Sequence, residues 1–230
     1  LITDINEWVQ RQTNLYRSGR LPDRQVLERA AEVLGILGSP SSFGVLLDLQ
    51  LAQVSAEISE TAREAMRGLE TDYVQTAVDV VNRRGVGNRL PALNYFLSDS
   101  SLSQQEHAQI ATGVLKEAMR ERVGDPAEVQ QWRDLRYMAV RVLMQVSYAD
   151  ATEPLIEHFN ATFRAYSQGV VAKTWVLEAI AALGNTGTEE AAQRLTTFLD
   201  LLNAFTENDR PYDTQIVLAT IRNLEALGNM

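Results

Sequence analysis

The sequence WVLEAIAALGNTG at residues 175–187 decides the fold, because the chain repeats its pattern. Residues 26–38, VLERAAEVLGILG, align with it so that Leu34 matches Leu183. Residues 216–228, IVLATIRNLEALG, fit the same frame. A pattern that returns after tens of residues indicates a repeat architecture, in which each unit packs mainly on its neighbours.

Each copy of this frame predicts a helix, because its apolar residues recur at the spacing of one helical face. A small residue one turn before the leucine allows a neighbouring helix to approach closely. Gly38 and Gly187 follow the last apolar position, where many helices end in a left-handed turn. Weaker copies occupy residues 58–70, 107–119 and 135–147. A polar break and a second amphipathic segment follow, so the repeating unit is a pair of helices.

The composition is typical of a folded helical protein. Of the 230 residues, 45% are hydrophobic and 22% are charged, and only 6 are proline. Such a chain is too apolar to be intrinsically disordered. Its abundant alanine and leucine favour helix over strand. We therefore predict an all-α fold.

One segment, residues 84–106, departs from the repeat. Polar stretches there bracket a short helix that we expect around residues 93–97. We expect a single domain over residues 1–230, with this irregular unit in its middle. The chain ends where another copy would begin, so we also expect a fragment of a longer chain.

Few residues offer catalytic or metal-binding chemistry. The chain has no cysteine, and its 2 histidines, His107 and His158, are not spaced as metal ligands. The sequence contains no nucleophile-elbow, P-loop or dinucleotide-binding motif. We therefore predict no catalytic residue, no metal site and no cofactor, and a protein that is not an enzyme.

The charge and hydropathy of the chain limit its partners. The formal net charge is −9, and nucleic-acid binding relies on contacts between cations and phosphates. The longest apolar stretch, residues 43–54, is too short and too often interrupted to span a bilayer. We expect neither a nucleic-acid partner nor a membrane-spanning segment. Whether the protein is cytoplasmic or exported, and how many copies assemble, stays open.

The pattern A-x-x-x-L-G-x-x-G, followed by a polar turn and a second helix, resembles the HEAT-repeat superfamily, including its bacterial members. Residues 26–54, 175–205 and 216–228 carry the resemblance most clearly. It implies a right-handed α–α superhelix, a solenoid of about six helix pairs. It also implies a scaffold that binds a protein partner, with the second helix of each pair on the concave face.

The frame predicts which residues line that concave face. Its helices are expected near residues 25–37, 57–69, 104–121, 131–146, 172–184 and 214–227. The candidate binding residues lie off the apolar stripe: Glu28, Glu32, Glu60, Glu64, Lys116, Arg141, Glu178 and Arg222. The four N-terminal carboxylates form two pairs at i, i+4 spacing, where like charges repel slightly. They are either a solvated face or a groove that receives a basic patch of the partner.

A second cluster lies in the middle of the chain. It combines an aromatic residue with five arginines: Trp132, Arg120, Arg122, Arg133, Arg136 and Arg141. Arginine beside an aromatic ring can anchor a protein interface or stack on bases. Nearby aspartate and glutamate residues roughly balance the charge. Local ion pairing, protein binding and nucleic-acid binding are the three interpretations, in that order.

Three functions therefore compete. The first is a non-catalytic scaffold for protein–protein interaction. The second is a HEAT-like DNA glycosylase or another nucleic-acid-binding solenoid, for which Trp132, Asp134 and Arg136 are the only suggestive cluster. The third is a structural protein of the cell envelope, which the absence of cysteine permits without demonstrating.

Overall fold

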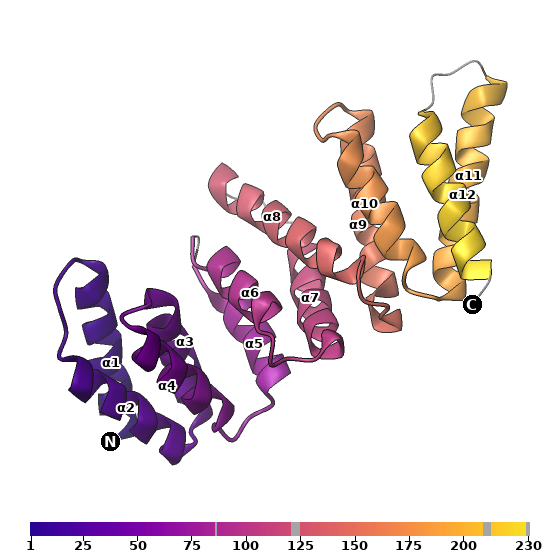
Figure 1. The fold of residues 1–230 in the computed structure, drawn as a ribbon. Helices are drawn as coiled ribbons and strands as arrows, with labels where there is room; N and C mark the ends of the chain where they lie inside the picture. The colour runs from indigo at the N-terminus through magenta and orange to yellow at the C-terminus, as the bar shows by residue number, and fades with distance from the viewer. Residues whose placement is uncertain (86, 121–124, 209–212, 229–230) are drawn as a thin grey trace. The chain divides into compact units, whose positions relative to one another are not determined.

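The computed structural model describes residues 1–85, 87–120, 125–208 and 213–228. Over these ranges the chain forms twelve α-helices and two short 3₁₀ turns, and no strand (Figure 1). The helices are α1 (Ile2–Arg17), α2 (Arg24–Leu37), α3 (Phe43–Ala52), α4 (Ala56–Arg67), α5 (Tyr73–Arg83), α6 (Arg89–Ser98), α7 (Gln104–Ala118), α8 (Pro126–Leu143), α9 (Thr152–Ser167), α10 (Lys173–Gly184), α11 (Glu189–Glu207) and α12 (Thr214–Gly228). The predicted all-α helical repeat is confirmed.

The helices fall into two compact units, residues 1–95 and residues 96–230. The boundary lies inside α6, within the segment that departs from the repeat in the sequence. The short helix expected around residues 93–97 is the C-terminal half of α6.

The N-terminal unit contains two rows of helices. Helix α1 packs beside α3, and α2 packs beside α4, while α1–α2 and α3–α4 are the sequential pairs. Fully buried side chains such as Leu34, Leu47 and Met66 fill the space between the rows. The repeated leucine of the frame is therefore a core residue, and burial of its side chain contributes roughly 2 kcal/mol to stability.

Two glycines of the repeated frame, Gly35 and Gly38, are needed for different structural reasons. A Cβ atom on Gly35 would lie 2.9 Å from the Cα atom of Ala65, so α2 and α4 approach each other too closely for a side chain. Gly38 ends α2 with φ 65°, in the left-handed region that favours glycine. Gly187 also has a positive φ, 73°, but it lies in the turn after α10, whose C-cap is Asn185, so it does not end the helix as the sequence predicted.

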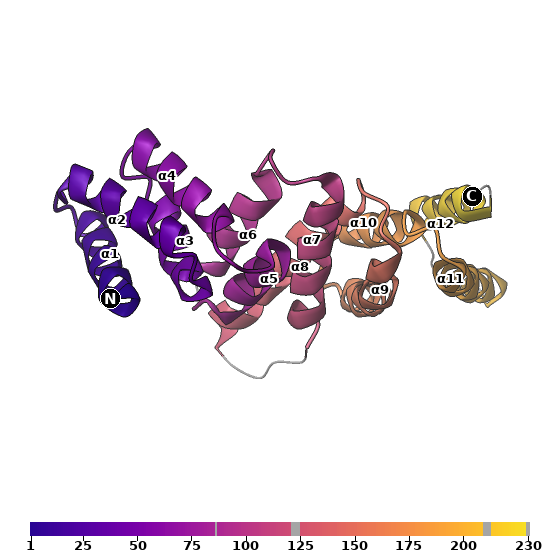
Figure 2. The same cartoon turned by 90° about the horizontal axis from the view of Figure 1, so that it is seen from below.

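The C-terminal unit repeats the two-row arrangement. Helices α7, α9 and α11 form one row and α8, α10 and α12 form the other. Figure 2 shows α9 beside α11 and α10 beside α12. A continuous core joins the pairs, and its largest fully buried rings are Phe159 and Phe198, in edge-to-face contact with centroids 4.8 Å apart. This core holds the helices of both rows in fixed positions within the C-terminal unit.

One repeat assignment from the sequence is wrong. Residues 107–119 were expected to form the same kind of helix as residues 135–147, yet α7 is the first helix of the α7–α8 pair. The reason is that α7 is buried on several sides, at Ile110, Val114 and Leu115 among others. An apolar pattern that surrounds a helix fits the frame but does not indicate the row to which the helix belongs.

Candidate functional site

The predicted binding residues lie on six helices. Their positions are Glu28 and Glu32 on α2, Glu60 and Glu64 on α4, Lys116 on α7, Arg141 on α8, Glu178 on α10 and Arg222 on α12. We call the row of α1 and α3 and the row of α7, α9 and α11 the first row of their unit, and the row of α2 and α4 and the row of α8, α10 and α12 the second row. All predicted residues except Lys116 lie on second-row helices. Lys116 does not, because α7 belongs to the first row.

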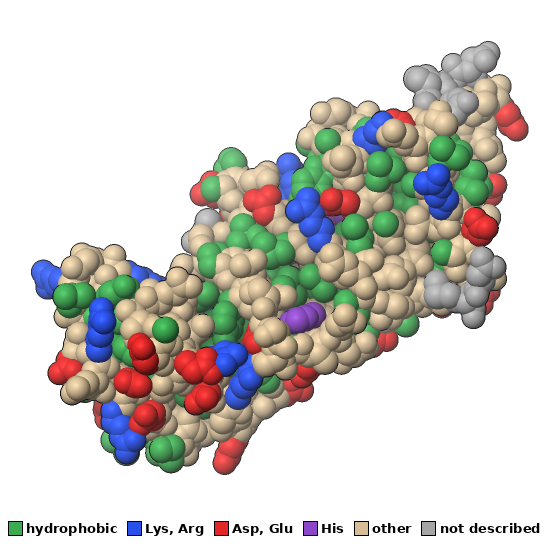
Figure 3. Space-filling model, in the orientation of Figure 1, with side chains coloured by type: hydrophobic (Ala, Val, Ile, Leu, Met, Phe, Trp, Pro, Cys, Tyr) green, Lys and Arg blue, Asp and Glu red, His purple; other side chains and the backbone are tan. Residues whose placement is uncertain are grey.

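The acidic residues of the N-terminal unit are partly neutralised. Glu32 pairs with Arg29, and Glu60 pairs with Arg63, one turn away on the same helix. Figure 3 shows Asp and Glu side chains next to Lys and Arg side chains over this unit. Two of the four predicted carboxylates therefore already have a cationic neighbour, which leaves a weaker attraction for a basic partner than four unpaired charges would exert.

The structure brings two predicted residues of the C-terminal unit together. Arg141 Nη2 lies 3.4 Å from Glu178 Oε1, across the α8–α10 contact. The guanidinium carbon of Arg141 is also 5.4 Å from the ring centroid of Trp175. Trp175 in turn stacks on Tyr137, with centroids 3.5 Å apart and an interplanar angle of 27°. We call these four residues the α8–α10 platform.

The four side chains of the platform range from buried to exposed. Tyr137 is buried, Trp175 and Glu178 are half-buried, and Arg141 is exposed. Burial raises the pKa of the Tyr137 hydroxyl. The sequence analysis included Arg141 and Glu178 but missed both aromatic residues. Helical spacing was the available signal, because Tyr137 lies one turn before Arg141 and Trp175 one turn before Glu178.

Beneath the platform lies the buried histidine of α9. The His158 ring is in edge contact with Tyr137 at 5.8 Å, and its Nε2 atom is 3.3 Å from Thr162 Oγ1. Burial lowers the pKa of His158 to about 3, and the neighbouring charge of Arg136 adds to this. The ring is therefore neutral at physiological pH and supports the platform as a packed side chain.

A groove with a volume of about 490 Å³ lies between α8 and α9, beside the C-terminal end of α7. We call it the α8–α9 groove. Its lining residues include Met119, Trp132, Arg136, Glu157, Asn160 and Arg164. Half-buried Arg136 is the most deeply placed cation, and burial lowers the pKa of its guanidinium.

The arginine cluster of the sequence is thus divided among the sides of α8. Arg136 lines the α8–α9 groove, Arg141 belongs to the platform, and Arg133 donates to Gln130. Arg120 also lines the α8–α9 groove and pairs with Glu117 on α7, while Arg122 lies outside the described residues.

The residues that suggested a DNA glycosylase also separate. Asp134 accepts a hydrogen bond from Gln130 and does not line the groove that contains Trp132 and Arg136. In the part of the chain that the structure describes, no group of three or more His, Asp or Glu side chains is arranged for a metal ion. The same described helices include none with the length and apolar character that a bilayer crossing requires.

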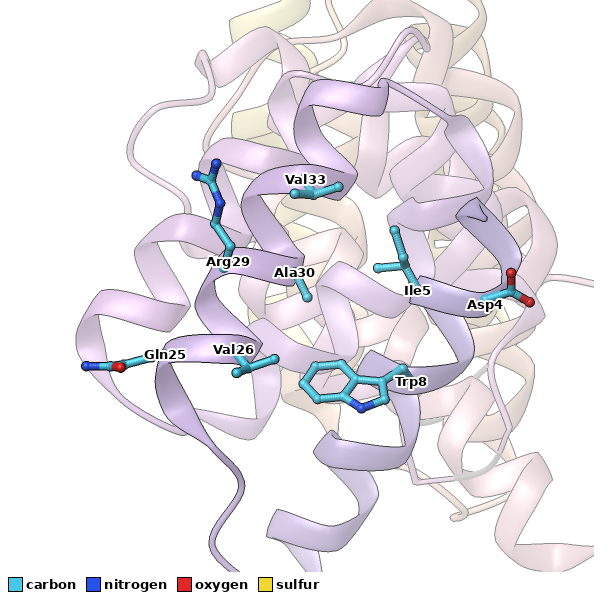
Figure 4. Close-up of a pocket in the computed structure, with 8 residues that line it drawn as sticks. All are labelled: Asp4, Ile5, Trp8, Gln25, Val26, Arg29, Ala30 and Val33. Atoms are coloured by element: carbon cyan, nitrogen blue, oxygen red, sulfur yellow. The ribbon is translucent and has the colours of Figure 1, made fainter.

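A second groove lies at the N-terminal end of the first unit, between α1 and α2 (Figure 4). Its volume is about 500 Å³. The indole of Trp8 points toward Val26 and Ala30, and Ile5 lies across from Val33. Its wall is almost wholly apolar.

Comparison with known proteins supports the repeat assignment. The family model described as PBS lyase HEAT-like repeat matches residues 176–200, which run from α10 into α11. The matched segment contains Gly184 and Gly187 of the repeated frame. Comparison with curated proteins and with solved structures gave no match.

Proposed function

We propose that the chain is a non-catalytic scaffold that binds a protein partner through the helices α2, α4, α8, α10 and α12. The HEAT-like repeat matched at residues 176–200 supports this proposal. Repeats of this type commonly mediate protein–protein interaction, so the fold favours this class of function without identifying the partner. The observation that carries the proposal is the α8–α10 platform.

The composition of the platform supports this role. Tryptophan, tyrosine and arginine are the residues that most often dominate the binding energy of protein interfaces. Here they are held in one stack by two packed helices, so little conformational entropy is lost when a partner binds. The pair formed by Arg141 and Glu178 adds both signs of charge, which selects partners by electrostatic complementarity.

The acidic residues of α2 and α4 form the second part of the proposal. Glu28, Glu32, Glu60 and Glu64 would attract a basic patch of the partner and increase the association rate. Because Arg29 and Arg63 already pair with two of them, we expect this contribution to be smaller than that of the platform.

A charge swap at the platform tests the proposal. The double variant Arg141→Glu with Glu178→Arg keeps an ion pair between α8 and α10 but reverses the charges that a partner meets. We expect it to retain the wild-type melting temperature and to bind the partner at least about tenfold more weakly. The partner is to be captured by crosslinking in a nuclease-treated native extract, identified by mass spectrometry, and its affinity then measured with purified proteins.

Asp200→Arg is the matched control, because Asp200 is an exposed carboxylate on α11, in the other row. We expect this variant to bind like the wild type. A partner that binds the wild type and the swapped variant equally well would contradict the role of the platform. Recovery of nucleic acid alone, when nuclease is omitted, would contradict the scaffold function itself.

A further inference from the structure

The α8–α9 groove contains a half-buried cation, Arg136, that no described carboxylate neutralises. The Nε atom of Arg136 is buried and makes no hydrogen bond. Its Nη1 atom contacts only the sulfur of Met119, at 3.7 Å. A guanidinium has five N–H donors, and in the described residues none of those of Arg136 meets a carboxylate.

Such an arrangement is energetically unfavourable for the protein alone. A buried charge destabilises the fold unless a counter-charge and hydrogen bonds compensate for the lost water. The nearest charged neighbours of Arg136 include Arg133, whose positive charge also lowers the pKa of Arg136. Among the described residues no anion pairs with Arg136, so its guanidinium is available to an anionic ligand in the groove.

The other groove residues restrict the chemistry of that anion. Asn160 Oδ1 accepts two hydrogen bonds from Arg194, at 2.9 Å and 2.6 Å, so its amide nitrogen is left as a donor. Exposed Arg164 adds a second cation, and Glu157 adds a negative charge. Arg120 also lines the groove, and Glu117 on α7 neutralises it. Because Glu157 repels a polyanion, the groove favours a ligand with a single negative charge.

Apart from Arg120, the remaining wall is apolar. Met119, Val129 and Trp132 line it beside Arg136, and Trp132 is only 3% exposed. A ligand that fills the groove therefore carries its charge next to an apolar body. A carboxylate is the singly charged group whose two oxygens match the planar fork of a guanidinium.

We propose that the α8–α9 groove binds a carboxylate attached to an apolar group, with Arg136 as its ion-pair partner. Two sources supply this chemistry: an acidic residue beside an apolar one in a partner protein, or a small organic acid. The inference goes beyond the scaffold function, because the small acid would bind without any protein partner.

Each of the three surfaces described above contains one of the three tryptophans of the chain, so one experiment can report on all three surfaces. Trp8 lines the α1–α2 groove, Trp132 the α8–α9 groove, and Trp175 belongs to the platform. We would titrate ¹⁵N-labelled protein with 3-phenylpropionate and record the three indole N–H resonances. The proposal predicts that the Trp132 resonance shifts with saturation and that those of Trp8 and Trp175 do not.

Two probe comparisons define the ligand. The neutral amide of 3-phenylpropionate should bind at least about tenfold more weakly than the acid, because it cannot form the ion pair. A blocked peptide with alternating glutamate and leucine is the second carboxylate probe, with glutamine replacing glutamate in its control. Tighter binding of the acidic peptide would identify a protein segment as the source, and tighter binding of the small acid would identify a metabolite.

Arg136→Met distinguishes a binding residue from a structural one. We expect this variant to lose affinity for 3-phenylpropionate by about tenfold or more and to melt at or above the wild-type temperature, because it removes an uncompensated buried charge. Arg133→Met, on the same helix but outside the groove, should bind like the wild type. An unmoved Trp132 resonance, equal binding of acid and amide, or unchanged affinity in Arg136→Met would each overturn the proposal. Loss of partner binding in the platform variants leaves this result unaffected.

Discussion

Replacing Gly184 with valine is expected to lower the free energy of unfolding by roughly 3 kcal/mol. Gly184 is the last residue of α10 and faces Asn223 of α12. A Cβ atom at this position would lie 2.2 Å from Asn223 Oδ1 and 2.6 Å from Asn223 Cβ. Rotation of the asparagine side chain relieves the first contact but not the second, so α10 and α12 must separate. Urea unfolding followed by circular dichroism measures the loss.

Gly44→Ala is the matched control for this prediction. Gly44 lies in α3, and no atom would approach within 4 Å of a Cβ built on it. Alanine is the better helix former, so we expect this variant to be unchanged or more stable by up to about 1 kcal/mol. If Gly184→Val were as stable as the wild type, α10 and α12 would not pack as closely as described.

The second large effect is an acid instability caused by His158. Its pKa is about 3 in the folded protein and about 6.5 in an unfolded chain. Between these two pKa values the unfolded state binds a proton that the folded state does not. The free energy of unfolding is therefore not lowered by His158 at a pH above the unfolded-state pKa, and it decreases as the pH falls toward the folded-state pKa. At about two pH units below the unfolded value, the loss is roughly 2–3 kcal/mol.

His158→Gln isolates this contribution, because glutamine can still bond to Thr162 but does not titrate in this range. We expect the free energy of unfolding of the wild type to decrease more steeply than that of the variant as the pH is lowered from 7. The carboxylates are the same in both proteins, so their effect cancels in the difference. Parallel pH profiles would show that His158 is not buried in the folded state.

Much of the fold follows from two positions of the repeated frame. Leu34 and Leu183 are fully buried, and Gly35 and Gly184 lie where a neighbouring helix approaches too closely for a side chain. The buried leucine was predicted from the helical spacing of the apolar residues. The close approach was predicted one turn before the leucine, at Ala30 and Ala179, whereas the structure also leaves no room for a side chain at the glycine that follows the leucine. The assignment of α7 failed, because its apolar residues surround the helix and carry no information about its row.

The candidate site was less predictable. Arg141 and Glu178 were selected because they lie off the apolar stripe, and the structure joins them. The role of Trp175 depends on its stacking against Tyr137, from a helix 38 positions earlier in the chain, which a pattern within one helix does not reveal. Arg136 belongs to a cluster that nearby acids balance in the sequence, but in the structure Asp134 accepts a hydrogen bond from Gln130 and Glu117 pairs with Arg120.

Site-specific photo-crosslinking tests the scaffold function most directly. A photoreactive amino acid would replace Arg141 on the platform or, as a control, Asp200 on α11, and each variant would be irradiated in a native extract. The proposed function predicts a defined protein adduct from position 141 that is absent from position 200. The same adducts from both positions, or no protein adduct from position 141, would contradict it.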